Sequence, residues 1–133
     1  MKISASILTA TAVIILMHLS SGECKRIAPA EVKPVIHNSI RYTAPHWGIA
    51  EGHEQNGGLV QAWDIKIGKM LWEIQVYKTE YNNKLERDVQ DVFIASLTIK
   101  DGKLIVLNKR NEEYEVDLTT KKVTKIQDKK KSD

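Results

Sequence analysis

Cysteine, phenylalanine and proline are scarce in this sequence. Its 133 residues include one cysteine, one phenylalanine and three prolines. A single cysteine cannot form an intramolecular disulfide, so a disulfide-stapled scaffold is excluded and the fold depends on packing alone. Because Phe93 is the only phenylalanine, most of the hydrophobic core must come from aliphatic side chains.

The composition is that of one folded domain. Hydrophobic residues make up 42% of the chain and charged residues 28%, a balance that allows enough apolar burial to offset the entropy of the chain. After removal of an N-terminal signal, roughly 110 residues would remain, which suffice for a single hydrophobic core. We therefore predict one domain over residues 39–127.

The net charge of +3 comes largely from lysines near the C-terminus. Residues 128–133 contain three of these lysines and are predicted to form a basic flexible tail. A surface that binds nucleic acid also needs aromatic side chains between its basic residues, and the tail has none. Nucleic-acid binding is therefore not expected.

The N-terminus has the features of a cleavable signal peptide. Lys2 precedes an apolar run at residues 7–19, which is too short to cross about 30 Å of hydrocarbon as a helix. Ser20 and Gly22 supply the small residues that signal peptidase requires for cleavage before Glu23. The sequence predicts a signal peptide over residues 1–22 and export to the periplasm or the medium, with an uncleaved anchor as the alternative.

Cys24 lies beside the expected cleavage site, where a lipid-modified N-terminal cysteine would stand. The residue before such a cysteine is normally Gly, Ala or Ser, whereas here it is Glu23. A lipoprotein is therefore the less favoured alternative. Contact with a membrane is expected only through the signal peptide or through a lipid on Cys24.

The remaining sequence predicts a small all-β domain. Residues 23–38 contain Pro29 and Pro34 and suit an extended linker. Short runs of β-favouring residues follow, separated by turn signals such as Gly57-Gly58 and Asp101-Gly102. We expect an antiparallel, blade-like meander of about seven short strands, at residues 39–44, 59–65, 69–77, 92–99, 103–107, 113–118 and 122–126. The polar connection at residues 78–90 has room for one helical turn.

Alternation of side chains predicts which face of each strand is buried. In the third expected strand, the apolar face is Met70, Trp72, Ile74 and Val76. In the fourth, it is Phe93, Ala95, Leu97 and Ile99. We therefore expect Trp72 to be buried against Met70, Ile74 and the strand that contains Phe93.

Residues 62–72 (AWDIKIGKMLW) resemble the Ala-x-Asp-x-x-Thr-Gly-x-x-x-Trp motif of quinoprotein-type (PQQ-like) β-propeller repeats. Such repeats occur in quinone-dependent dehydrogenases and outer-membrane assembly factors. Asp64, Gly68 and Trp72 match the motif, and Ile67 stands where the family has Thr. The resemblance implies that the Asp side chain bonds across the hairpin turn and that the Trp docks on a neighbouring blade. A fainter copy at residues 114–126 aligns Asp117 with Asp64 but lacks the Gly and the Trp.

The resemblance concerns local hairpin geometry rather than an activity. A closed propeller needs at least about four blades of four strands, and this chain has too few strands for that. It is similar to a single blade-type sheet that stands alone or closes on itself. The family's quinone lies in the central channel of a complete ring, so one copy of this chain is expected to hold no cofactor.

The loop at residues 45–54 (PHWGIAEGHE) contains the one cluster of chemical interest. It brings together His46, Glu51 and His53, whose imidazole and carboxylate groups are suitable zinc ligands. The spacing matches no strong metal motif, so ordinary polar loop residues are the alternative. A G-x-S-x-G nucleophile elbow is absent, and no base is placed beside a serine by the sequence.

Two hypotheses about function remain. The first is an exported, non-catalytic binding or structural module that contacts an unidentified protein or envelope partner through strand edges or loops. The second is a metal-binding protein or metal-dependent enzyme centred on His46 and His53. The sequence identifies no ligand for either.

Overall fold

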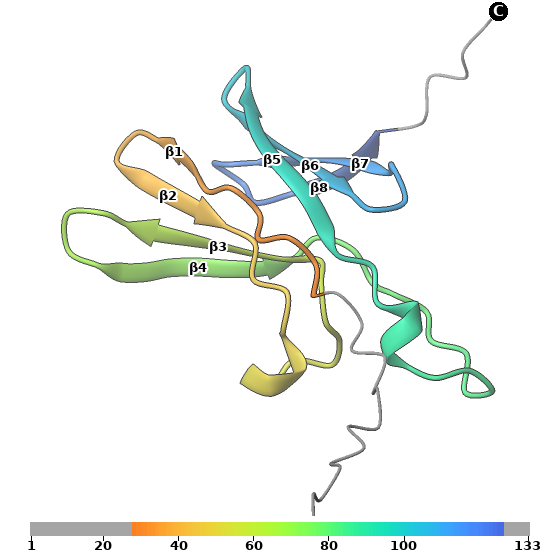
Figure 1. Ribbon diagram of the computed structural model, residues 1–133. Helices are drawn as coiled ribbons and strands as arrows, with labels where there is room; N and C mark the ends of the chain where they lie inside the picture. Colours follow the sequence, from red (N-terminus) through yellow and green to blue (C-terminus); the bar gives the residue numbers. More distant parts are fainter. Residues whose placement is uncertain (1–27, 127–133) are drawn as a thin grey trace, which may run out of the picture.

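The computed structural model describes residues 28–126 and confirms the all-β expectation. Eight strands form two antiparallel sheets of four strands, each a meander in chain order (Figure 1). The first sheet contains β1 (Val35–His37), β2 (Ile40–Thr43), β3 (Leu59–Asp64) and β4 (Lys69–Gln75). The second contains β5 (Ile94–Lys100), β6 (Lys103–Asn108), β7 (Glu113–Asp117) and β8 (Val123–Ile126). The expected signal peptide and basic tail lie outside the described residues.

Strand β1 lies within the segment that we expected to be a linker. It pairs with β2 through a tight turn in which Asn38 and Ser39 have φ angles of 50° and 61°, as a type I′ hairpin turn requires. The described sheet therefore begins at Val35 rather than at Ser39. Residues 35–37 form too short a run for the sequence alone to predict a strand there.

Only two short 3-10 helices accompany the strands in residues 28–126. They are η1 (Ile49–Glu51), in the β2–β3 connection, and η2 (Asp88–Gln90), before β5. The second is the single helical turn expected in the polar connection. Neither helix in this described part is long and apolar enough to cross a membrane.

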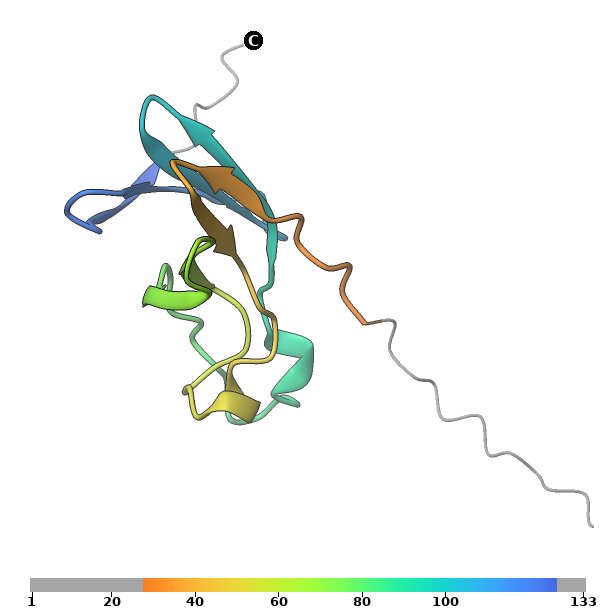
Figure 2. The same ribbon diagram turned by 90° about the vertical axis from the view of Figure 1, so that its left-hand side faces the viewer.

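The two sheets share one hydrophobic core. β1 of the first sheet lies against β5 of the second, as Figures 1 and 2 also show. Cross-strand pairing places Val35, Tyr42, Ala62 and Trp72 in one row across the first sheet, and all four belong to or pack on the core. From the second sheet, Leu104, Val106 and Val116 are fully buried. The core is mainly aliphatic, as the scarcity of phenylalanine predicted.

A β-bulge in the first sheet corrects the face predicted for Met70. Ala62 lies opposite Trp72, but Trp63 lies opposite Met70, so Leu71 is an extra residue in β4. The bulge turns Met70 to the outer face of the sheet, away from Trp72. The prediction that both face the core was wrong because it assumed unbroken alternation.

A second bulge corrects the face predicted for Phe93. Ile94 pairs with Asn108 and Ser96 with Leu107, so Ala95 is the extra residue in β5. Ile94 and Leu97 are therefore both buried in the core. Phe93 does not reach Trp72 and contacts the rings of His46 and Trp47 instead.

Trp72 packs between the two sheets and is only partly buried. Its ring centroid lies 5.9 Å from that of Tyr42, in the same sheet. From the second sheet's β7–β8 turn, Lys121 Nζ lies 5.7 Å from the centre of the Trp72 ring. Trp72 packs on the core that includes Ile94 and Leu97 of β5, and it also meets the β7–β8 hairpin, a contact that the sequence did not predict.

The β3–β4 and β7–β8 hairpins close with the same arrangement. Asp64 Oδ1 accepts the N–H groups of Lys66 and Ile67 at 2.8 and 3.3 Å. Asp117 Oδ1 accepts those of Thr119 and Thr120 at 2.8 and 2.9 Å. Gly68 and Lys121, each four residues after its aspartate, have φ angles of 67° and 63°. The N–H of Gly68 donates to Asp64 O, and that of Lys121 donates to Asp117 O. The two segments aligned in the sequence therefore form equivalent turns, although a lysine replaces the glycine in the second.

Candidate functional site

The two long connections lie together at one end of the molecule, below the sheets in Figures 1 and 2. They are residues 44–58, between β2 and β3, and residues 76–93, between β4 and β5. Gln55 joins them, since its Nε2 donates to Tyr77 O at 3.1 Å and its Oε1 accepts the Thr79 N–H at 2.8 Å. This buried glutamine holds the loops in one arrangement.

Tyr77 fixes the same loops to the second sheet. Its hydroxyl donates to Val92 O at 2.6 Å, and its ring stacks on Tyr114 of β7 with centroids 5.2 Å apart. Burial raises the pKa of Tyr77 strongly, with a further contribution from Tyr114. The hydroxyl therefore remains a proton donor, and the loop end rests on a rigid support.

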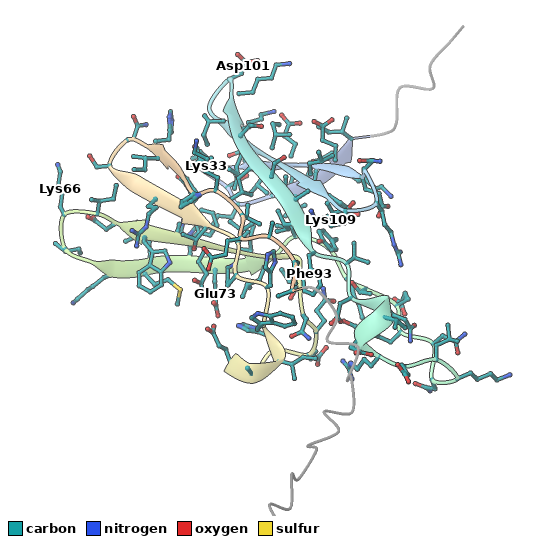
Figure 3. The ribbon with its side chains drawn as sticks, in the orientation of Figure 1. Lys33, Lys66, Glu73, Phe93, Asp101 and Lys109 are labelled. Carbon is teal, nitrogen blue, oxygen red and sulfur yellow. The ribbon has the colours of Figure 1, made fainter. Side chains whose placement is uncertain are left out.

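A cavity of about 450 Å³ opens between the β2–β3 loop and the N-terminal residues 28–32. We call it the aromatic pocket, because His46 and Trp47 line it and Phe93 supports both rings. The Phe93 centroid lies 4.9 Å from that of His46 and 5.4 Å from that of Trp47, with the rings edge to face. Figure 3 shows Phe93 at the start of the β5 strand, above the loop end. Trp47 is 52% exposed, so the residue is accessible to a ligand.

His46 lines this pocket and has one ring nitrogen that is buried without a hydrogen-bond partner among the described residues. The residue is only 7% exposed, and its Nε2 lies 2.8 Å from Ala30 O. Since a carbonyl oxygen only accepts, Nε2 carries the proton and Nδ1 is left as an acceptor. Nδ1 is the one buried side-chain polar atom in the described part of the chain without a hydrogen-bond partner. A buried polar group without a partner costs about 1–3 kcal/mol, so this nitrogen destabilises the loop.

The charged groups around the pocket are of one sign. Glu31 and Glu51 line it, and none of its described lining residues is lysine or arginine. Its apolar walls include Pro29, Val32 and Pro45. The aromatic pocket thus combines apolar surface, negative charge and hydrogen-bond acceptors.

The structure separates His53 from the other two residues of the predicted metal site, since His46 and Glu51 line the aromatic pocket and His53 does not. His53 lies on another side of the loop, with Nε2 3.4 Å from Glu73 Oε1 of β4, and Figure 3 shows Glu73 extending from the sheet toward this loop. Glu51 is exposed in η1, and His46 Nε2 is occupied by Ala30 O. Residues 28–126 contain no group of three His, Cys, Asp or Glu residues able to hold a metal ion. The metal hypothesis gains no support from this geometry.

A second cavity of about 550 Å³ lies beside His53 and is lined mainly by polar and charged residues. Arg87 lines this cavity and donates to Glu54 O. Its guanidinium carbon lies 4.4 Å from the centre of the Tyr81 ring. Tyr81 in turn donates to Asp91 at 2.8 Å. These polar groups bond to one another, so we assign them to stabilising the loop end rather than to binding a ligand.

The motif residues Asp64, Gly68 and Trp72 build the β3–β4 hairpin and do not line the aromatic pocket. Sequence reasoning missed Trp47 and Phe93 as site residues. The available signal was a tryptophan beside His46 in a glycine-rich loop, where an exposed aromatic residue often marks binding.

No protein-family model matches this chain, and no curated protein is significantly similar to it. The fold and the pocket are therefore the basis for inferring a function.

Proposed function

We propose that this protein is an exported, non-catalytic binding module whose ligand site is the aromatic pocket. The observation that carries the proposal is the half-exposed Trp47 beside buried His46, whose Nδ1 has no partner among the described residues. Apolar walls with a few convergent polar groups are typical of ligand sites. The equivalent turns at Asp64 and Asp117 support a relationship to PQQ-like repeats, in which this chain would be a blade-like unit that binds without a quinone.

The pocket favours a protonated amine carried on an apolar stem. The carboxylates of Glu31 and Glu51 attract positive charge, and the face of a tryptophan ring binds cations. The ligand class is therefore a small diamine or the lysine side chain of a partner peptide.

Titration of ¹⁵N-labelled protein with cadaverine tests this site. The chain has three tryptophans, so three indole N–H signals report separately on the pocket and on the sheets. We expect the Trp47 signal to shift in a saturable manner while those of Trp63 and Trp72 stay in place. The double variant Glu31→Gln, Glu51→Gln should lose the response, because the pocket then lacks its charge.

Glucose is the matched control, because it offers hydroxyl donors without a charge. A saturable Trp47 shift with glucose but not with cadaverine would show that the pocket binds a ligand, but it would refute the proposal that the ligand is an amine. Failure of both compounds to shift Trp47 would overturn the binding site itself.

Export is tested by the intact mass of protein recovered from the cell envelope or the medium. The expected mass is that of a chain that starts at Glu23. A mass that still includes residues 1–22 would contradict cleavage. A chain that starts at Cys24 and carries acyl groups would show that the lipoprotein alternative is correct.

A further inference from the structure

The outer face of the first sheet carries apolar side chains although it faces away from the core. Cross-strand pairing places Ile36, Arg41, Trp63 and Met70 in one row across its four strands. The neighbouring row on the opposite face is the core row of Val35, Tyr42, Ala62 and Trp72. A sheet with one face in the core normally presents polar residues on the other. This row departs from that pattern.

The apolar row continues into the turn of the β3–β4 hairpin. Ile65 and Ile67 lie in the turn, and Leu71 is the extra residue of the adjacent bulge. We call this surface the hairpin patch; it consists of Ile36, Trp63, Ile65, Ile67, Met70 and Leu71. Five of the six, all except Trp63, are 43% to 66% exposed. Gln61 and Glu73, which bond to each other at 3.1 Å, form the polar row that borders the patch.

Positive charge is interspersed with these apolar side chains. Lys66 lies between Ile65 and Ile67 in the turn, and Arg41 lies within the outer row, whereas Lys69 pairs with Asp64 on the opposite face. Figure 3 shows Lys66 extending from the tip of the hairpin, away from the rest of the molecule. The one acid within residues 62–72 is Asp64, whose Oδ1 accepts two N–H groups of the turn. The patch therefore presents apolar groups within reach of cations.

We propose that the hairpin patch docks on the surface of an anionic lipid bilayer. Apolar side chains that enter the interfacial region gain from leaving water, and adjacent lysines gain from negative headgroups. The alternation Ile65-Lys66-Ile67 suits a surface with negative charge above a hydrocarbon layer. The Asp64 turn already orders this tip, so little conformational entropy is lost on docking. This contact is independent of the aromatic pocket and of any lipid on Cys24.

Vesicle co-sedimentation tests the docking surface. The chain from Glu23 onward, which contains every described residue, is mixed with phosphatidylcholine vesicles with or without phosphatidylglycerol. We expect binding only when phosphatidylglycerol is present, and weaker binding at higher salt because exposed charges are screened. The double variant Ile65→Ser, Ile67→Ser should lower partitioning at least about tenfold. Lys66→Gln should lower it about fivefold, and Lys69→Gln, on the opposite face of the hairpin, should lower it less.

Leu85→Ser, Val89→Ser is the matched control. Both residues are more than half exposed, and they lie in the loop that contains η2 rather than in the hairpin patch. This variant should bind vesicles as the wild type does, and all variants should keep the wild-type melting temperature because the replaced side chains are exposed.

Three outcomes would overturn the proposal. The first is the same binding to neutral and anionic vesicles, and the second is equal loss in the control variant. The third is an absence of vesicle binding together with self-association in sedimentation velocity that Ile65→Ser, Ile67→Ser abolishes. That last result would assign the patch to contact between two copies of the chain.

Discussion

Gly57 joins the aromatic pocket to the chain that leads into the second sheet. Its N–H donates to His46 O at 2.8 Å, and its φ angle is +75°. A Cβ at this position would lie 2.3 Å from Val92 O and 2.9 Å from the Val92 carbonyl carbon. That same oxygen accepts the Tyr77 hydroxyl. Any side chain at residue 57 would therefore force backbone to move at the junction of the loops.

We predict that Gly57→Ala lowers the free energy of unfolding by about 3 kcal/mol or more. The left-handed conformation costs a residue with a Cβ about 1–2 kcal/mol. The clash with Val92 adds a further cost of about 1–3 kcal/mol, as in overpacked cores, and a lost Tyr77 hydrogen bond adds about 1 kcal/mol. For a domain of about 100 residues, each 1 kcal/mol lowers the Tm by about 4–8 °C. The Tm of Gly57→Ala should therefore fall by about 12 °C or more.

Gly102→Ala is the matched control for this prediction. Gly102 has a φ angle of +72°, and a Cβ there would meet nothing within 4 Å. Its substitution should cost only the conformational strain of about 1–2 kcal/mol. Thermal unfolding followed by circular dichroism should show a clearly larger fall in Tm for Gly57→Ala. Equal shifts in the two variants would refute the steric argument and leave only strain.

Two further predictions concern the contact between the sheets and the β7–β8 turn. Trp72 is only partly buried beside Tyr42, so Trp72→Ala should cost about 2 kcal/mol, roughly half of what a fully buried tryptophan costs; Trp47→Ala should lower the Tm less, and the reverse order would contradict the packing. Hydrogen bonds from the backbone N–H groups of Thr120 and Thr119 lower the pKa of Asp117 from its usual 3.8. The turn's contribution to stability is therefore present above the unfolded pKa and is lost as the pH falls through the lower folded pKa. Because Asp117→Asn keeps the acceptor oxygen without titrating, its Tm should fall less than that of the wild type below about pH 4, and identical pH profiles would contradict this assignment.

Features that depend on a few neighbouring residues could be predicted from the sequence. Asp101 and Gly102 have the positive φ angles that an Asp-Gly hairpin turn requires. Asp117 occupies the same position in its turn as Asp64 does, as their alignment suggested. Each of these features depends on backbone geometry within one hairpin, which is why the sequence alone was sufficient.

The faces of β4 and β5 depended on tertiary structure. The bulges at Leu71 and Ala95 reverse the alternation, because the strands adjust to pack Trp72 and Ile94 in a shared core. β1 is a strand because β2 pairs with it, and three residues by themselves carry too little pattern to predict that pairing. The division into two sheets likewise follows from packing between distant hairpins.

The sequence by itself determined the all-β class, most of the hairpin turns and the mainly aliphatic core, because turn chemistry and side-chain alternation act over a few residues. It also pointed to the loop that contains His46, with a zinc site and ordinary polar loop residues as the alternatives. Only the tertiary structure separated His53 from His46 and brought Phe93 beside Trp47. The tertiary structure also buries His46 Nδ1 without a hydrogen-bond partner among the described residues. Burial and hydrogen-bond satisfaction depend on segments far apart in the chain, so the character of the pocket was decided by packing.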